Sequence, residues 1–513
     1  MGVYSCKYFI NADFRKTYSN VNEVIHSDST SFPFFKIHFI NGDVSVLEKW
    51  NVSENKDSII GHGKLYDFNR NQIEEGSLAF SIDDIAIIET NQLETIKSKD
   101  KSRIARLSIL TGTNLIMNIF CISNPKACFG SCPTFYVNGN KMLHSANAEG
   151  FSSSIAPSLE KKDIDALQYS TSSEQFFLTM KNEAFETHAV NQLSIDAVRK
   201  NKNKTIYHDP QGYYYQCDKL FKPRIAIADK KEIQGSLSRI DDLEYFSLTD
   251  STDLSAKEDI ILEYGNIPQT DLGLVLNYRQ TLLTTFLLYS GISYMGNEFG
   301  NYFAQIETNN QIKQKLGNPF KRLGTIRIYV WDEDLVKWKY VESIYETGPI
   351  AKNLTIVPLR NTFRKNGKLK IKMELTKGLW RLDYAALTSI ESKVAPLSIQ
   401  PNEITTVIGG NYTVDAVHND DKDYLMSFPG NEYRFKFDLP ALGENEDYEL
   451  FLSSKGYYLE WIRQEWLKGK NVPKLKKMLM NDESTWRDLA REFKTVEKDM
   501  EAVFWNSKYS FIQ

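Results

Sequence analysis

The chain has 513 residues, too many for one ordinary domain, and its 42% hydrophobic and 25% charged residues are typical of a globular protein. Its net charge of −4, with basic residues spread along the chain, gives no electrostatic reason to expect nucleic acid as a partner. The most apolar run, residues 107–122, is shorter than the roughly 20 apolar residues that a membrane-spanning helix needs, so it predicts buried strands instead.

A cysteine near the N-terminus lies in a motif that resembles the lipobox of bacterial lipoproteins, whose cysteine is acylated. In Val3-Tyr4-Ser5-Cys6 the aliphatic and the small residue fit, whereas Tyr4 stands where a small residue is usual. The charged start and apolar run of a signal peptide are missing, which is expected if the chain was trimmed or if Met1 is a late methionine within a longer gene. The alternatives are a terminal thiol in a cytosolic protein and N-myristoylation, which calls for Ser or Thr at position 6. The resemblance implies a lipoprotein of the bacterial cell envelope, in the outer membrane, with residues 1–31 as lipobox remnant and polar tether.

Residues 32–103 predict a small β-barrel or sandwich. Apolar and polar residues alternate on both sides of Asn41-Gly42, the dipeptide best suited to a type I′ hairpin turn. The run 77–91 continues the alternation, and the polar run 91–103 is expected to close the unit as a solvated loop.

The next unit, 104–225, is predicted to be a β domain that contains the other cysteines. Cys121, Cys128, Cys132 and Cys217 form an even set, which an oxidising compartment favours. Cys128 and Cys132 flank Phe-Gly-Ser, and the glycine permits a turn tight enough for a disulfide. Parity alone suggests Cys121 and Cys217 as a second bridge. Zinc is the alternative, but Cys-x3-Cys is not the usual zinc spacing.

The run CFGSCPTFYV, residues 128–137, resembles a CFGxCPxY segment of uncharacterised bacterial envelope proteins, in which it leads into a β-hairpin. The resemblance extends over 121–190, which includes NEAFETHAV, and the runs 378–387 and 454–467 resemble the C-terminal part of such chains. It implies a compartment and a tendency toward β structure, but no activity.

Residues 226–400 predict a jelly-roll-like β-sandwich with a helical insertion at 282–317, because short strands recur at regular spacing around that segment. Four aromatic residues of this unit are candidates for stacking on sugar rings: Trp331, Trp338, Tyr340 and Trp380. The alternative is that they fill the core.

Residues 401–513 predict short strands followed by helices. Asp420, Asp421 and Asp423 offer oxygen ligands for a structural calcium ion, although the spacing and glycine of an EF-hand are missing. In the last helix the apolar residues recur at intervals of three and four, which places them on one face that is expected to pack on the rest of the chain. They are Trp486, Leu489, Phe493, Val496, Met500 and Val503. Asp482 or Ser484 is expected to cap its start.

No familiar catalytic motif is present in the sequence. His188 lies two residues after Glu186 on a predicted strand, so both are expected on one face, where a structural role is favoured over a catalytic one.

The sequence therefore predicts a mainly β protein with some α, built from several sandwich or barrel domains, one of them jelly-roll-like, with C-terminal helices. We expect a binding or scaffold component of the bacterial envelope rather than an enzyme, anchored to the membrane by lipid, with an envelope protein or glycan as partner and no cofactor apart from the calcium. The alternatives are a carbohydrate-binding surface protein and a hydrolase whose catalytic residues meet only in the fold.

Overall fold

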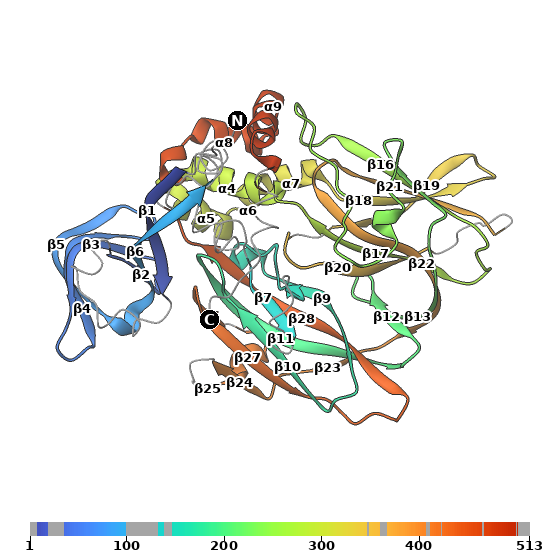
Figure 1. The fold of residues 1–513 in the computed structure, drawn as a ribbon, viewed down its shortest axis with the longest axis horizontal. Coiled ribbons are helices and arrows are strands. Elements are labelled where there is room, and N and C mark those ends of the chain that lie inside the picture. The colour runs from blue at the N-terminus through green and yellow to red at the C-terminus, as the bar shows by residue number, and fades with distance from the viewer. Residues whose placement is uncertain are drawn as a thin grey trace, which may run out of the picture.

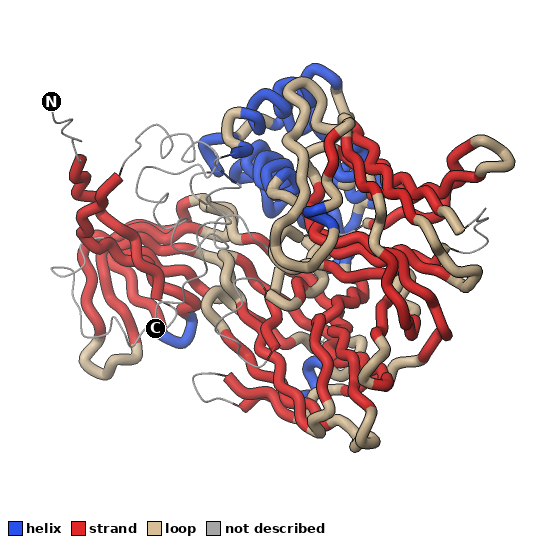
Figure 2. Tube along the Cα trace, turned by 45° about the vertical axis from the view of Figure 1, so that its right-hand side comes forward, coloured by secondary structure: helices blue, strands red, loops and turns tan. Residues whose placement is uncertain are grey.

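The computed structural model describes residues 8–18, 35–98, 132–137, 146–345, 348–359, 367–406, 411–421, 423–463, 466–498 and 500. Within these ranges the chain is mainly β, with strands in five sheets and helices gathered at one side (Figures 1 and 2). The predicted fold class is therefore confirmed. The sheets form three β units, and each unit has its own hydrophobic core.

The first β unit is a strongly bent six-stranded antiparallel sheet. Its strands in spatial order are β1 (Tyr8–Tyr18), β6 (Ile85–Ser98), β2 (Phe35–Phe39), β3 (Val44–Val52), β4 (Ser58–Tyr66) and β5 (Gln72–Ser81). The predicted hairpin joins β2 and β3, but its turn is not the expected type I′. Gly42 takes a positive φ of 86° whereas Asn41 does not, and the Gly42 N–H donates a 2.9 Å hydrogen bond to the Phe39 carbonyl oxygen. Phe35 stacks on Trp50 at 3.9 Å in the core of this unit.

Two sequence expectations for this unit are wrong. Residues 8–18, expected within the tether, pair with β6 along their whole length, and residues 91–98, expected within a solvated loop, form the second half of β6. Polar composition does not prevent an edge strand from forming, because the ladder is made by backbone groups that every residue carries.

The second β unit is a sandwich assembled from two distant parts of the chain, 132–201 and 397–460. One layer contains β25 (Asn411–Tyr412), β24 (Glu403–Thr406), β27 (Glu432–Asp438), β10 (Gln175–Lys181), β7 (Thr134–Val137) and β8 (Ala148–Glu149). The other contains β23 (Leu397–Ile399), β11 (Glu186–Asn201), β28 (Glu446–Glu460) and β9 (Lys161–Thr171), with β26 (Leu425–Ser427) against β11. The regions 104–225 and 401–513, expected as separate domains, thus share one core.

The third β unit is inserted between those two parts. Its closed barrel consists of β12 (Thr205–His208), β13 (Tyr214–Phe221), β22 (Trp380–Val394), β17 (Leu272–Gln280) and β20 (Asn353–Pro358). Its open sheet consists of β15 (Lys231–Glu232), β14 (Ile225–Ala228), β16 (Lys257–Tyr264), β21 (Leu369–Thr376), β18 (Ile326–Asp332) and β19 (Lys337–Ile344). The largest hydrophobic cluster of the described chain lies between these two layers.

The helices form a layer beside the β units, at the top of Figures 1 and 2. The predicted insertion supplies α4 (Leu283–Met295), α5 (Phe299–Thr308), α6 (Asn310–Leu316) and α7 (Asn318–Leu323), and the C-terminal region supplies α8 (Val472–Leu479) and α9 (Glu483–Lys494). The first three predicted residues of the apolar face, Trp486, Leu489 and Phe493, lie on α9 and pack on the chain, with Phe493 5.0 Å from Phe286 between ring centroids. The helix ends at Lys494, before Val496 and Met500, and Val503 lies outside the described residues. Asp482 caps α9 by accepting a 3.0 Å hydrogen bond from the Thr485 N–H.

Candidate functional site

The helical layer and the sandwich leave a cleft of about 540 Å³ between them. Helices α4, α6 and α7 form one wall, the loop around residues 152–159 forms the facing wall, and residues 345 and 348–349 close one side. The lining is mostly apolar, with Leu159, Leu288, Leu316 and Phe320 among its side chains. The insertion leaves the third unit after β17 and returns to it at β18. Contacts such as the 3.1 Å hydrogen bond from the Ser158 N–H to Glu307 of α5 join it to the facing wall.

The charged side chains that line the cleft are all cationic in the part of the chain that the structure describes. Lys313 is half-buried and donates to the Ser158 carbonyl oxygen, so its ammonium group is fixed beside the facing wall. Lys321 and Arg327 are exposed, and the Arg327 guanidinium lies 3.3 Å from a Glu374 carboxylate oxygen. An anionic group that enters the cleft meets positive charge without a competing carboxylate on the lining.

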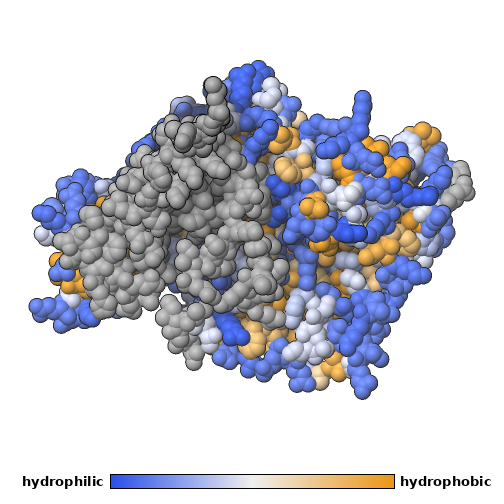
Figure 3. Space-filling view, viewed as in Figure 1, coloured by the Kyte–Doolittle hydropathy of each residue, from blue (hydrophilic) through white to orange (hydrophobic). Residues whose placement is uncertain are grey.

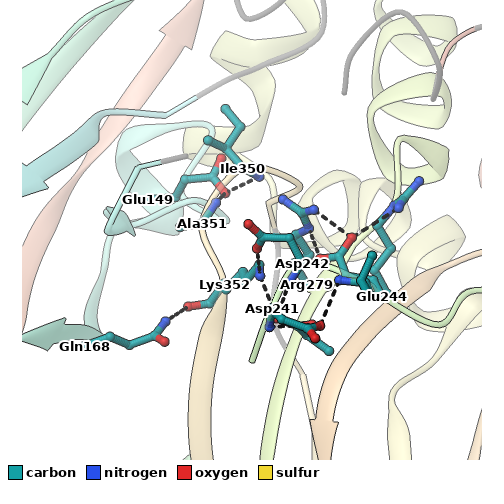
Figure 4. Close-up of polar contacts among 12 residues, drawn as sticks. Glu149, Gln168, Asp241, Asp242, Glu244, Arg279, Ile350, Ala351 and Lys352 are labelled. Atoms are coloured by element: carbon teal, nitrogen blue, oxygen red, sulfur yellow. Dashed lines mark hydrogen bonds and ion pairs between the residues drawn. The ribbon is translucent and has the colours of Figure 1, made fainter. Parts of the chain in front are cut away.

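The side of the cleft formed by residues 348–349 is held by a buried carboxylate (Figure 4). One oxygen of Glu149 accepts hydrogen bonds from the Ile350 and Ala351 N–H groups, both at 2.8 Å. Gly348 has a φ of 105°, and a Cβ built on it would lie 2.5 Å from the Glu149 carboxylate. This position therefore requires glycine for two reasons, its backbone conformation and the close approach of Glu149.

The same segment is anchored to the barrel by ion pairs (Figure 4). Lys352 Nζ lies 2.6 Å from Asp383 Oδ2 and also contacts Asp242. Gln168 of the sandwich donates a 3.2 Å hydrogen bond to the Lys352 carbonyl oxygen. These contacts tie residues 350–352 to the sandwich and to the barrel of the third unit.

A second part of this network places one carboxylate between two guanidinium groups. Glu244 contacts Arg279 at 2.6 Å and Arg381 at 3.1 Å, and the two arginines are direct partners in the β17–β22 ladder. All three side chains are almost fully buried. Because removal of Glu244 would leave two buried guanidinium groups without this partner, the cluster fixes the position of the loop that carries Glu244.

A separate buried cluster contains the histidine and glutamate that the sequence singled out. His188 Nε2 lies 2.6 Å from Glu186 Oε1, both side chains are fully buried, and both lie on β11. Glu460 of β28 is the direct cross-strand partner of Glu186, and Tyr289 of α4 donates a 3.3 Å hydrogen bond to it. The cluster joins the sandwich to the helical layer, and none of these four residues lines the cleft.

Burial is the main influence on the pKa of Glu460 in this cluster. Burial, followed by the nearby charge of Glu186, raises the pKa of Glu460 to about 8. Arg463 opposes this shift, with its guanidinium 3.6 Å from Glu460 Oε2. The sequence predicted that Glu186 and His188 share one face of a strand, but it did not indicate Glu460 or Arg463. Local sequence patterns do not show which distant strand will pair with β11.

Four aromatic residues were predicted to stack on sugar rings, and for Trp380 this prediction is wrong. It is 1% exposed and packs edge-on against Tyr278 in the core of the third unit. Trp331 and Trp338 are half-buried cross-strand partners with ring planes 69° apart, and Tyr340 is 57% exposed on the same hairpin. The two tryptophan rings are inclined to one another and do not form a flat platform.

The predicted calcium site is also wrong. Asp420 Oδ1 is engaged by Lys455 at 2.5 Å and by Asn191, and Asp421 Oδ1 accepts a 2.9 Å hydrogen bond from the Asp423 N–H. All three residues are exposed, and two of their carboxylates are already engaged by protein groups. Across the described ranges, no group of three or more His, Cys, Asp or Glu residues is placed to hold a metal ion.

The described part of the chain contains no disulfide, and Cys6, Cys121 and Cys128 lie outside it. Cys132 Sγ donates to Glu149 Oε1 at 3.4 Å, beside the cleft. Cys217 is a buried free thiol inside the barrel, so the second bridge suggested by parity is not formed. Burial raises the pKa of this thiol to about 12.

No protein-family model matches the chain, and no curated protein matches it either. Among the helices of the described ranges, none has the length and apolar character needed to cross a bilayer.

Proposed function

We propose that this protein is a binding component that holds a small amphipathic anion in the cleft between α4–α7 and the sandwich. The observation that carries the proposal is the lining of this cleft, which is apolar in its walls and carries cations without carboxylates among the described residues. Its volume of about 540 Å³ is within the range of ligand pockets, roughly 300–1,000 Å³.

The expected affinity follows from the two parts of such a ligand. A twelve-carbon carboxylate that buries its chain gains about 9 kcal/mol at roughly 0.8 kcal/mol per methylene. The loss of translational and rotational freedom costs at least about 4 kcal/mol, and a charge-assisted hydrogen bond to Lys321 or Arg327 returns about 2 kcal/mol. The balance of about 7 kcal/mol corresponds to a dissociation constant on the order of 10 µM.

Binding is favoured over hydrolysis by the position of the carboxylates. Glu186, Glu460 and His188 converge, but they are sealed inside the protein and do not line the cleft. Sugar binding is disfavoured because Trp380 is in the core and the exposed rings are not coplanar.

Location in the bacterial envelope, through an acylated Cys6, is part of the proposal and is supported by the sequence around that cysteine alone. A mass spectrum of the N-terminal peptide of protein expressed from its native gene tests it. An acyl chain on Cys6 supports the envelope assignment, and an unmodified thiol there contradicts it.

The cleft is tested by calorimetric titration with dodecanoate, dodecanol and dodecyltrimethylammonium. We expect dodecanoate to bind most tightly, and the double variant Lys321→Gln/Arg327→Gln to bind it about tenfold more weakly, the loss of roughly 1.4 kcal/mol. Leu288→Trp, which fills the cleft, should weaken both dodecanoate and dodecanol. Lys219→Gln, an exposed lysine on the barrel strand β13, is the matched control. Equal binding of the cationic amphiphile, or no binding of any of the three, would contradict the proposal.

A further inference from the structure

The hairpin formed by β18 and β19 projects from the body of the third unit, at the right of Figure 1. Its four-residue tip, residues 333–336, carries two apolar side chains in water. Leu335 is 54% exposed and Val336 is 71% exposed, and Figure 3 shows orange atoms along this edge of the molecule. Apolar side chains at the tip of a projecting hairpin are suited to contact with another surface.

Hydrogen bonds and an ion pair within the hairpin fix the conformation of this tip. Asp332 Oδ1 accepts hydrogen bonds from the Asp334 and Leu335 N–H groups at 3.0 and 2.9 Å, and its other oxygen pairs with Lys339. Behind the tip, two cross-strand aromatic pairs stiffen the stalk, Trp331 with Trp338 and Tyr329 with Tyr340. The aromatic rings that the sequence suggested for sugar binding thus have a structural use on this hairpin.

The backbone at the tip is strained. Val336 has a φ of 50°, a left-handed conformation that suits Gly or Asn and is unfavourable for a β-branched residue. A turn selected only for stability would carry Gly or Asn at this position. An exposed valine in a strained backbone conformation points to use of its side chain.

The charges of the tip narrow the choice of partner. Glu333 is exposed, and neither the hydrogen bonds nor the ion pairs of the described residues occupy its carboxylate; Asp334 is exposed beside it. Insertion of Leu335 and Val336 into a bilayer would carry these two acids toward the hydrocarbon, which is costly. An apolar recess with a cationic rim accommodates both the apolar and the acidic side chains.

The cleft between α4–α7 and the sandwich combines apolar walls with cationic side chains. A molecule cannot fill it with its own tip, because Arg327 at the cleft and the tip lie at opposite ends of the seven-residue strand β18, about 20 Å apart at 3.3 Å per residue. We propose that the hairpin tip of one molecule docks in the cleft of a second copy of this chain. The inference rests on the proposed function, since it names a macromolecular occupant of the same cleft with the same combination of apolar and anionic groups.

The contact is heterologous, since tip and cleft are different surfaces, so each bound molecule still offers one free tip and one free cleft. Such contacts build open chains, or a ring if the rotation closes. A contact of one hairpin tip buries little area, so association should be weak and visible only at high concentration.

Sedimentation equilibrium tests this proposal, at concentrations up to about 500 µM. We expect the average mass of the wild-type protein to rise with concentration. The tip variant Val336→Gly relieves the strained φ, so its thermal midpoint should stay the same or rise while its self-association falls at least tenfold. The cleft variant Lys321→Glu/Arg327→Glu should also remain monomeric. An equimolar mixture of the two variants should form dimers and nothing larger, because only one intact tip and one intact cleft meet.

Three results would overturn the proposal: a monomeric wild-type protein at every concentration, a Val336→Gly variant that associates like the wild type, or a mixture that remains monomeric. A fourth is binding to anionic phospholipid vesicles that Val336→Gly abolishes while solution association is unchanged, which would assign the tip to a membrane. The Val336→Gly variant also separates the two proposals, because dodecanoate titration of this monomer tests the cleft without a competing tip. Failure of that titration counts against the small ligand alone.

Discussion

The replacement Glu460→Gln tests the electrostatics of the buried cluster between the sandwich and the helical layer. Glu460 is 2% exposed and lies directly opposite Glu186 across β11 and β28. Its pKa of about 8 in the folded protein is above the ordinary value of 4.5 for a glutamate, because burial and the charge of Glu186 disfavour ionisation. Between these two values, the folded state keeps a proton that the unfolded state releases.

The sign of the effect follows from this difference. A carboxyl with a raised pKa contributes its full stability below pH 4.5, and this contribution is lost as the pH rises toward 8. The slope is about 1.4 kcal/mol per pH unit, so from about pH 5 to about pH 7 the free energy of unfolding should fall by roughly 3 kcal/mol through this one group. Glutamine has no proton to lose, so the variant should gain that amount relative to the wild type over the same interval.

The difference in the free energy of unfolding between variant and wild type is measured by urea denaturation, with tryptophan fluorescence as the signal. Trp461 and Trp466 lie beside the cluster and report on it. The matched control is Glu446→Gln at the other end of β28, which reports the loss of a partly exposed carboxylate from the same strand. A difference between Glu460→Gln and wild type that stays flat from about pH 5 to about pH 7 would refute the reasoning. It would mean that Arg463, rather than a proton, neutralises Glu460.

Three further outcomes are expected. Gly348→Ala should destabilise the protein by about 1–3 kcal/mol and weaken dodecanoate binding, because alanine is strained at a φ of 105° and its Cβ would displace Glu149 from the cleft wall; a melt and a titration unchanged from wild type would contradict this. Trp380→Ala should cost about 3–5 kcal/mol in urea denaturation, the effect of a large core residue packed on Tyr278, whereas a surface ligand platform would tolerate it. The thiol of Cys217 should resist iodoacetamide in the native protein near pH 8 and react only after unfolding, because its pKa is about 12 and its sulfur is buried; rapid native labelling detected by mass spectrometry would show that the barrel opens.

Local sequence signals predicted the elements that depend on neighbouring residues. Asn41-Gly42 indicated a turn between β2 and β3, because glycine and asparagine favour turns, although the predicted type I′ geometry was wrong. Asp482 and the spacing of apolar residues indicated the start and the buried face of α9, since a helix cap and a helix face involve residues three or four apart.

Signals of the same kind failed where a strand needed a distant partner. Residues 8–18 looked like a tether because their hydropathy is low, yet β6 gave their backbone a complete ladder. The sandwich joins 132–201 to 397–460, and periodicity cannot report which of many strands will pair. The burial of Trp380 was equally hidden, because an aromatic residue on a strand has the same local pattern whether its face meets a second layer or water.

The sequence by itself determined the fold class, the helical insertion, the hairpin turn and the proximity of Glu186 to His188, because each depends on spacing along a short segment. Only the tertiary structure decided which carboxylate faces Glu186, which cations line the cleft and which hydrophobic side chains remain in water. Those outcomes depend on which surfaces cover one another when segments hundreds of residues apart pack together. Burial and charge pairing act between surfaces in space, so they become readable only once the layers are in place.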